Sequence, residues 1–275
     1  MTPNKRLGQH FLTDRNILDR IVDALDPAPG EVVLEIGPGR GSLTEVLLAR
    51  GLTVIAVEKD RRLAHECGVR NAEFGVERLS IVRGDALRLD WHVLIAGDTA
   101  TPHSALHTPH FKVVGNIPYN ITSPLLEKAL TPPLPGRVVF LVQKEVADRL
   151  AAGPGSRVYG ALSVGVQAQC HVERLFTVPA GAFTPRPKVT SALVRLTPLP
   201  DSAITPGEVP AFRTFVTACF ARRRKQLRNV LMGVTGQSAA VVTAGLRELG
   251  LDAAARPETL GAPAFARLLR WSARL

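Results

Sequence analysis

The chain has 275 residues, enough for one large domain and a smaller one with a full hydrophobic core. Its hydrophobic fraction of 45% and charged fraction of 21% are close to globular averages, which excludes a disordered or fibrous protein. No apolar run approaches the roughly 18 residues of a membrane span. The charged start of the chain lacks the apolar segment of a secretory signal. These observations predict a cytoplasmic protein.

The net charge of +10 comes from 34 Lys and Arg against 24 Asp and Glu, and it is unevenly distributed. Residues 199–275 carry eleven cations and five acids, a net of +6, whereas the preceding residues carry 23 and 19, a net of +4. A basic excess of this kind favours a polyanionic partner. The C-terminal third is the more basic end.

The sequence predicts no metal site. The cysteines are far apart without a C-x-x-C pair, so we expect ordinary core residues at Cys67, Cys170 and Cys219. Three histidines have the spacing of helical metal ligands, but prolines interrupt the segment and no acid or cysteine is adjacent. A solvent-facing loop is therefore favoured for His103, His107 and His110.

Helical and strand-like segments alternate along the first two thirds of the chain. A helix with a capping signal at Thr13-Asp14 comes first, and another is predicted over 42–50. Short apolar strands are predicted at 32–36, 54–57, 79–82, 111–114, 138–142 and 192–196. This alternation predicts an α/β fold with a doubly wound parallel sheet.

The composition changes after a proline-rich linker that begins near residue 198. Three helices are predicted beyond it, over 212–231, 238–249 and 263–271. We therefore predict a first domain of residues 1–198 and a small helical domain of residues 199–275.

A glycine-rich turn joins the first predicted strand to the next helix. It reads Glu35-Ile36-Gly37-Pro38-Gly39-Arg40-Gly41, and glycines in this context let the backbone approach a nucleotide closely. The spacing differs from the G-x-G-x-x-G word that seats a pyrophosphate, which disfavours NAD. Glu35 would repel a pyrophosphate but can attract a cationic sulfonium. The alternative is a tight turn without a ligand, which the flanking strand and helix disfavour.

Acidic side chains follow the next two strands. Glu58 ends the second strand, where a carboxylate can accept from both hydroxyls of a ribose. Asp85 follows the third strand, where it can accept from an adenine amino group. Because the carboxyl ends of parallel strands meet at one edge of a sheet, we expect these acids to lie near Gly37 and Gly39. Their order and spacing predict an S-adenosylmethionine site.

The word Asn116-Ile117-Pro118-Tyr119 comes directly after the fourth strand. If the Asn116 side-chain oxygen and the Pro118 carbonyl each accept one hydrogen of an adenine amino group, the nitrogen lone pair is aimed at a sulfonium methyl. Positioning and electrostatics then supply most of the acceleration, and no strong general base is needed. Tyr119 can stack on the base. The alternative is a strand that ends in an ordinary proline turn.

Two segments are predicted to contact RNA. The loop Phe183–Val189 reads FTPRPKV, in which Phe183 can stack on a base while Arg186 and Lys188 face phosphate. On the predicted helix 212–231, a run of cations indicates a nucleic-acid footprint, with Arg222, Arg223 and Lys225 as the expected phosphate contacts. The alternatives are a proline-braced connection for the loop and a solvated charged face for the helix.

Several sequence motifs, taken in their order along the chain, resemble those of the ribosomal RNA small subunit adenine dimethyltransferases, the kasugamycin-sensitivity methyltransferases. The resemblance covers nearly the whole chain. It rests on KRLGQHFL, LEIGPGRGSLT, VVGNIPYNITSPLL, LVQKEVADRL, PGSRVYGALSV, FTPRPKVTSALV and FARRRKQLRNVL.

The resemblance implies a class I S-adenosylmethionine-dependent methyltransferase with a Rossmann-like sheet and a small all-α C-terminal domain. The implied reaction is dimethylation of the exocyclic N6 of two adjacent adenosines in a hairpin loop near the 3′ end of 16S ribosomal RNA. S-adenosylhomocysteine is the implied product. The implied substrate is small-subunit RNA within a late pre-30S particle, and we expect a monomer.

The resemblance also assigns residues. It implies that an N-terminal segment closes over the cofactor and that Phe183 and Tyr119 sandwich a flipped adenine. The implied cofactor contacts are His10, Leu12, Gly37, Gly39, Glu58, Asp85 and Asn116.

Three other functions stay open at this point. A related adenine methyltransferase of large-subunit RNA would share the cofactor and N-I-P-Y words. An assembly factor would occupy the immature subunit and use methylation only to time its release. A dehydrogenase is disfavoured by the glycine spacing.

Overall fold

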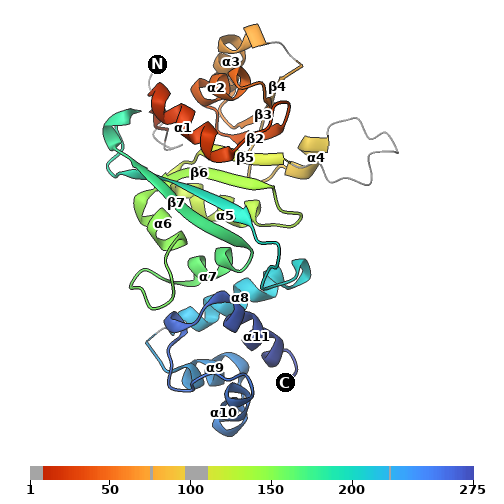
Figure 1. Ribbon diagram of the computed structural model, residues 1–275, viewed down its shortest axis with the longest axis vertical. Helices are drawn as coiled ribbons and strands as arrows, with labels where there is room; N and C mark the ends of the chain where they lie inside the picture. The colour runs from red at the N-terminus through yellow and green to blue at the C-terminus, as the bar shows by residue number, and fades with distance from the viewer. Residues whose placement is uncertain (1–8, 75–76, 97–110, 223) are drawn as a thin grey trace. The chain divides into compact units, whose positions relative to one another are not determined.

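The computed structural model describes residues 9–74, 77–96, 111–222 and 224–275 (Figure 1). Its strands are β1 (Phe11–Leu12), β2 (Val32–Ile36), β3 (Thr53–Glu58), β4 (Leu79–Arg83), β5 (Phe111–Asn116), β6 (Arg137–Gln143), β7 (Cys170–Val178), β8 (Phe183–Thr184) and β9 (Ser191–Pro198). Its α-helices are α1 (Arg15–Leu25), α2 (Ser42–Ala49), α3 (Arg61–Arg70), α4 (Trp91–Ala96), α5 (Thr122–Ala129), α6 (Lys144–Leu150), α7 (Ala161–Gln167), α8 (Val209–Phe220), α9 (Leu227–Thr235), α10 (Ala239–Glu248) and α11 (Ala262–Ser272). None of the helices in these ranges is long and apolar enough to span a membrane. The histidines at 103, 107 and 110 lie outside the described residues.

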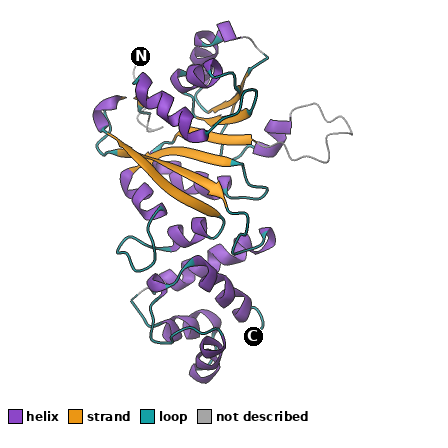
Figure 2. Cartoon of the chain, viewed as in Figure 1, coloured by secondary structure: helices purple, strands orange, loops and turns teal. Residues whose placement is uncertain are grey.

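Seven strands form one sheet in the order β4-β3-β2-β5-β6-β9-β7 (Figure 2). The first five of these are parallel, and β9 runs antiparallel to β6. Helices α1 to α3 lie on one side of the sheet and α5 on the other (Figure 1). The predicted α/β doubly wound architecture is confirmed, with an antiparallel β9 that the sequence pattern does not reveal.

The inner strands of the sheet and the edge strand β7 differ in burial. In β2 and β6 nearly every residue is buried, as expected where helices cover both faces of a parallel sheet. In β7, at the sheet edge, only the two terminal residues are buried and the rest are partly or fully exposed. Its sequence CHVERLFTV therefore lacks the continuous apolar run, and no strand was predicted there.

Helix α1 begins where the sequence predicts. The Asp14 carboxylate accepts a hydrogen bond from the Ile17 amide at 3.2 Å, which satisfies one free N–H of the first turn. The apolar face with 3,4 spacing is buried against the sheet, through Leu18, Ile21, Val22, Ala24 and Leu25.

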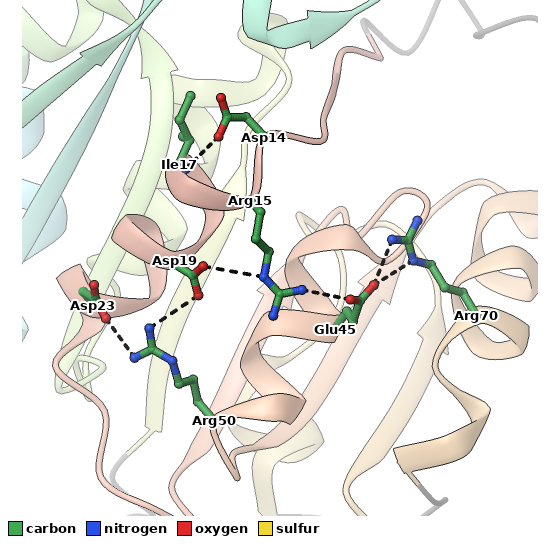
Figure 3. A network of polar contacts seen from close by, with 8 residues as sticks. All are labelled: Asp14, Arg15, Ile17, Asp19, Asp23, Glu45, Arg50 and Arg70. Carbon is green, nitrogen blue, oxygen red and sulfur yellow. Dashed lines mark hydrogen bonds and ion pairs between the residues drawn. The ribbon is translucent and has the colours of Figure 1, made fainter.

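Ion pairs join the polar face of α1 to α2 and α3 (Figure 3). Arg15 Nη1 lies 2.9 Å from Glu45 Oε1, and Arg70 Nη2 lies 2.8 Å from Glu45 Oε2. Arg50 Nη1 lies 2.8 Å from Asp23 Oδ1. Exposed ion pairs contribute up to about 1 kcal/mol each to the stability of the fold. The main effect of this network is therefore to hold α1 beside α2, the helix that follows the glycine turn.

The chain divides into two compact units, one of Met1–Ala147 with Glu173–Thr197 and another of Asp148–Val172 with Pro198–Leu275. The break at 197–198 coincides with the linker that the sequence shows. Residues 148–172 pack with the second unit, because Tyr159 is fully buried there and its hydroxyl donates to the Leu260 carbonyl at 2.9 Å. The sequence pattern predicts this segment in the first domain, and the division of function between the two domains stays a prediction.

The predicted helix over 212–231 is wrong in its middle. Helix α8 ends at Phe220 and α9 begins at Leu227, so Arg222 and Lys225 lie in a turn and not along a helix. Ala221, Arg222, Arg224, Lys225 and Gln226 are all exposed, so none of these described residues continues the buried face of α8. Arg223 lies outside the described residues.

A second, two-stranded sheet joins β1 to β8, with Phe11 opposite Thr184 and Leu12 opposite Phe183. Leu12 and Phe183 belong to the buried core cluster of the first unit. This pairing fixes the segment before α1 next to the loop 183–189.

Candidate active site

A cavity of about 280 Å³ opens at the carboxyl ends of β2, β3, β4 and β5. The strand order places β3 on one side of β2 and β5 on the other, so the cavity lies at the switch point where α/β sheets bind ligands. Nine predicted site residues line it, namely His10, Leu12, Gly37, Gly39, Glu58, Asp85, Asn116, Pro118 and Tyr119. Phe183, Arg186, Lys188, Arg222 and Lys225 are not among the residues that line this cavity.

The glycine turn has the backbone that its sequence requires. Gly37, Gly39 and Gly41 have φ of 69°, 59° and 81°, a region that other residues rarely adopt. A Cβ on Gly39 would lie 3.1 Å from the Phe11 ring, and a Cβ on Gly41 would collide with the Asn71 side chain. The turn is therefore closed from two sides, by β1 and by the end of α3.

Glu35 is buried beneath this turn and is 1% exposed. The Thr44 hydroxyl donates to its Oε2 at 2.6 Å, and no cationic side chain of the described residues pairs with it. Burial, opposed by the Thr44 hydrogen bond and assisted by the nearby Glu58 charge, raises the pKa of Glu35 to about 7. A cation bound nearby would stabilise the ionised form of this buried carboxyl.

Glu58 ends β3 with both carboxylate oxygens engaged by backbone amides. Oε2 accepts from Gly39 N at 3.1 Å and Oε1 accepts from Asp60 N at 2.8 Å. Burial raises its pKa in spite of these hydrogen bonds. The carboxylate retains lone pairs that can accept from hydroxyl groups in the cavity.

Asp85 lines the cavity and forms an ion pair. Its Oδ2 lies 2.9 Å from Lys59 Nζ and its Oδ1 accepts from Leu87 N at 3.0 Å. The hydrogen bond from Lys59 is the main cause of the lowered pKa of Asp85. Lys59 follows Glu58 directly and was not among the predicted site residues.

Asn116 ends β5 and contacts the N-terminal segment. Its Nδ2 donates to the His10 carbonyl at 2.8 Å. Because a carbonyl can only accept, this contact leaves Oδ1 as the acceptor atom of the amide. Asn116 therefore offers the cavity the atom type that an amino group requires.

Pro118 and Tyr119 begin a short 3₁₀ turn, η3 (Tyr119–Ile121), ahead of α5. The Pro118 carbonyl accepts from Ile121 N at 3.1 Å and from the Thr122 hydroxyl at 3.4 Å, so its lone pairs are already in use. The Ile117 carbonyl, on the same loop, accepts no hydrogen bond within the described part of the chain. Tyr119 is half-buried, and its hydroxyl is 2.8 Å from Ser191 Oγ.

The loop 183–189 has a buried start and an exposed middle. Phe183 is 3% exposed within the core and does not face the cavity. The ring that stacks on Tyr119 is that of His10, with centroids 5.9 Å apart and an interplanar angle of 30°. Arg186 and Lys188 are both exposed, as a contact with phosphate requires.

Three residues of the site, Phe11, Thr44 and Lys59, were not predicted from the sequence. Phe11 covers Gly39 and also lies under the Arg40 guanidinium, 4.9 Å from the ring centroid. Thr44 lies nine positions after Glu35, and no short-range pattern links the two. The charge of Lys59 next to Glu58 is visible in the sequence, but its partner Asp85 is 26 positions away.

Comparison with known proteins identifies the family to which the chain belongs. A family model described as ribosomal RNA adenine dimethylase matches residues 1–254. The chain belongs to the ribosomal RNA adenine dimethylase family.

Relatives of this adenine dimethylase cover almost all of it. A protein of Hahella chejuensis named "Ribosomal RNA small subunit methyltransferase A" is 42% identical over 265 residues, which are 96% of this chain and 90% of the relative. A protein of the same name from Xanthomonas campestris pv. campestris strain 8004 is 44% identical over 267 residues, 96% and 94% of the two chains.

Two solved structures are also similar to the dimethylase. A dimethyladenosine transferase from Plasmodium falciparum matches with a TM-score of 0.79 and 28% identity, over 94% of this chain and 96% of that one. The 23S rRNA methyltransferase ErmE matches with a TM-score of 0.70 and 25% identity, over 95% and 98%. Both share the Rossmann-like methyltransferase fold.

The dimethylase uses S-adenosylmethionine as its cofactor, and the cavity suits that molecule. Glu35 is a buried carboxyl without a cationic partner among the described residues, whereas the cofactor carries a sulfonium and an ammonium group. Glu58 and Asp85 supply acceptors for hydroxyl and amino groups. Among the described residues no group of three or more His, Cys, Asp or Glu side chains could hold a metal ion.

Proposed function

We propose that the dimethylase transfers methyl groups to the exocyclic N6 of two adjacent adenosines in a hairpin loop near the 3′ end of 16S ribosomal RNA. The observation that carries this proposal is the position of Asn116 and Tyr119 at the cavity that contains Glu58 and Asp85. An amide acceptor and an aromatic ring thus lie beside the cofactor residues. The names of the two bacterial relatives support the small subunit as the substrate.

The cofactor would be held by residues from four strand ends and the N-terminal segment. Glu58 would accept from the ribose, Asp85 from the adenine amino group, and the backbone of the glycine turn would approach the amino-acid end. The backbone at His10 and Leu12, together with Asn116, would also contact the cofactor. The bound cofactor supplies an electrophilic methyl group on a sulfonium, and S-adenosylhomocysteine is the product.

Asn116 would orient the target amino group. Its Oδ1 accepts one amino hydrogen, which directs the nitrogen lone pair and reduces its conjugation with the ring. Pro118 can supply the second acceptor only by sharing a carbonyl that already accepts from Ile121 and Thr122. Ile117 lines the same cavity, and its carbonyl, for which no donor is found among the described residues, is the alternative second acceptor.

Tyr119 would stack on the flipped adenine. Phe183 was expected on the opposite face of the base, and from its buried position it would have to move to reach the base. Extrusion from a hairpin loop costs less than extrusion from a duplex, which suits a loop substrate.

The exposed cations would contact RNA phosphates. Arg186 and Lys188 lie in the loop 183–189 and Arg222 and Lys225 in the turn between α8 and α9, all exposed; Arg223 is proposed on its sequence alone. We further propose that the enzyme acts in the cytoplasm, as a monomer, on the pre-30S particle.

Mass spectrometry of ribosomal RNA from cells that lack the protein, before and after addition of the enzyme with S-adenosylmethionine, tests the proposal. Two adjacent dimethyladenosines in the small-subunit RNA are expected, and Asn116→Ala serves as the inactive control. Methylation of large-subunit RNA instead would favour the activity named for ErmE. Restored subunit assembly without methylation would favour an assembly factor.

A further inference from the structure

His10 contacts two segments of the first unit that are far apart in sequence. Its backbone carbonyl accepts from Asn116 Nδ2, its ring stacks on Tyr119, and its Nδ1 lies 2.8 Å from the Pro185 carbonyl oxygen, 175 positions away. The first two contacts are with the N-I-P-Y loop and the third is with the loop 183–189.

The side chain of His10 is fixed at two points. Because the Pro185 carbonyl can only accept, Nδ1 carries the proton and donates. The ring meets Tyr119 at a centroid distance of 5.9 Å and 30°, within the range of favourable aromatic contacts. These two contacts hold the imidazole between the loops.

The backbone of His10 determines which atom of Asn116 can accept. The two ends of an amide side chain have the same shape, and the hydrogen bond to the His10 carbonyl selects the orientation in which Nδ2 is occupied. In the reversed orientation Asn116 would present N–H groups to an amino group and could not accept its hydrogen. If the His10 carbonyl were not held in place, the Asn116 amide could reverse, and the amino group of the substrate would no longer be correctly oriented.

We propose that His10 is a positioning residue for methyl transfer, whose imidazole, anchored on the Pro185 carbonyl and the Tyr119 ring, holds the backbone carbonyl that orients the Asn116 amide. The inference rests on the proposed function of Asn116. This role differs from a cofactor contact by the same residue, because loss of the His10 side chain is expected to change the rate of methyl transfer and the orientation of the Asn116 amide.

The test compares His10→Ala with His10→Asn and with the control His65→Ala. Asn can place an amide N–H near the former Nδ1 and so restore the donor to Pro185, whereas Ala cannot. His65 is exposed on α3 and does not line the cavity. Steady-state methylation of small subunits gives kcat and the KM for S-adenosylmethionine, and circular dichroism melting shows that all variants are folded.

We expect kcat of His10→Ala to fall on the order of ten- to a hundredfold, the cost of a misplaced reacting group, with little change in the KM for the cofactor. His10→Asn should recover most of the loss and His65→Ala should match the parent. An unchanged kcat in His10→Ala, an equal loss in His10→Asn, or a rise in cofactor KM with kcat intact would each overturn the proposal.

A second readout is independent of the substrate. The Asn116 side-chain amide is observed by ¹⁵N NMR of the cofactor-free enzyme and assigned through Asn116→Asp. We expect a single amide environment in the parent and His10→Asn, and a shifted, faster-exchanging signal in His10→Ala. An identical signal in all three overturns the positioning role, whereas a parent that leaves small-subunit RNA unmethylated overturns the proposed function alone.

Discussion

Glu35 gives the most quantitative prediction. Replacement by Gln keeps an oxygen that can accept from Thr44 Oγ1, at present 2.6 Å from Glu35, but removes the ionisable group. In the folded protein the pKa of Glu35 is raised from 4.5 to about 7, with burial as the main cause. The unfolded chain therefore loses this proton at lower pH than the folded one.

The sign follows from the raised pKa. Below pH 4.5 both states are protonated and Glu35 has no effect on the free energy of unfolding. Between pH 4.5 and about 7 only the unfolded state ionises, so stability falls as the pH rises. At about 1.4 kcal/mol per unit, the loss reaches about 3 kcal/mol above the folded pKa. Glu35→Gln should therefore be more stable than the parent at pH 8 by up to about 3 kcal/mol, and close to it near pH 5.

Urea unfolding between pH 5 and 8, followed through Trp91 fluorescence in a Trp271→Phe background, measures this difference in the first unit alone. Thr44→Val is the matched control, because loss of its hydrogen bond should raise the pKa of Glu35 further and move the pH-dependent step upward. Parallel pH profiles for Glu35→Gln and the parent would refute the reasoning, since they would show that Glu35 titrates alike in both states.

Three further changes test the site and the second unit. Asn116→Ala should lower the rate of methyl transfer by about 10² to 10³ while cofactor binding measured by calorimetry stays nearly intact; unchanged methyl incorporation into small subunits would contradict the assigned acceptor. Joint replacement of Arg222 and Lys225 by Gln should weaken RNA binding and reduce the slope of log K against log salt by about 0.7 to 0.9 per lost phosphate contact; an unaltered slope in filter binding would remove them from the interface. Gly245→Ala would drive a Cβ into the Trp271 indole, so a loss of about 1–3 kcal/mol is expected by thermal unfolding, and an equal melting curve would show that the ring can move away.

The sequence was most informative where one short segment contains all the residues on which a prediction depends. The parallel strands β2, β3, β4, β5 and β6 and the acids and amide at their ends were all predicted, because apolar runs followed by Gly, Glu, Asp or Asn show strand and site together. The strand-order rule then brings these ends to one cavity without any further information.

The sequence was least informative where a contact joins distant segments. The β1–β8 pairing, the ring stack of His10 on Tyr119 and the ion pair of Lys59 with Asp85 each depend on tertiary structure. The burial of Phe183 was also not predicted, since an aromatic residue before a proline-rich loop suits exposure and core equally. The break between α8 and α9 was not predicted, because arginine has a high helix propensity and a basic run therefore resembles a continuous helix in the sequence. The helix ends for reasons of tertiary packing, which the sequence does not show.

The β1–β8 pairing has a consequence for the order of folding. Its partners are separated by most of the first unit, and the entropy cost of closing so long a loop must be met before the contact is formed. During synthesis the glycine turn and the N-I-P-Y loop leave the ribosome well before residue 184, so the parallel strands can assemble while the segment at residues 9–12 still lacks its partner. Contacts of such long range form late, and methyltransferase competence is then expected only after the loop 183–189 has been translated.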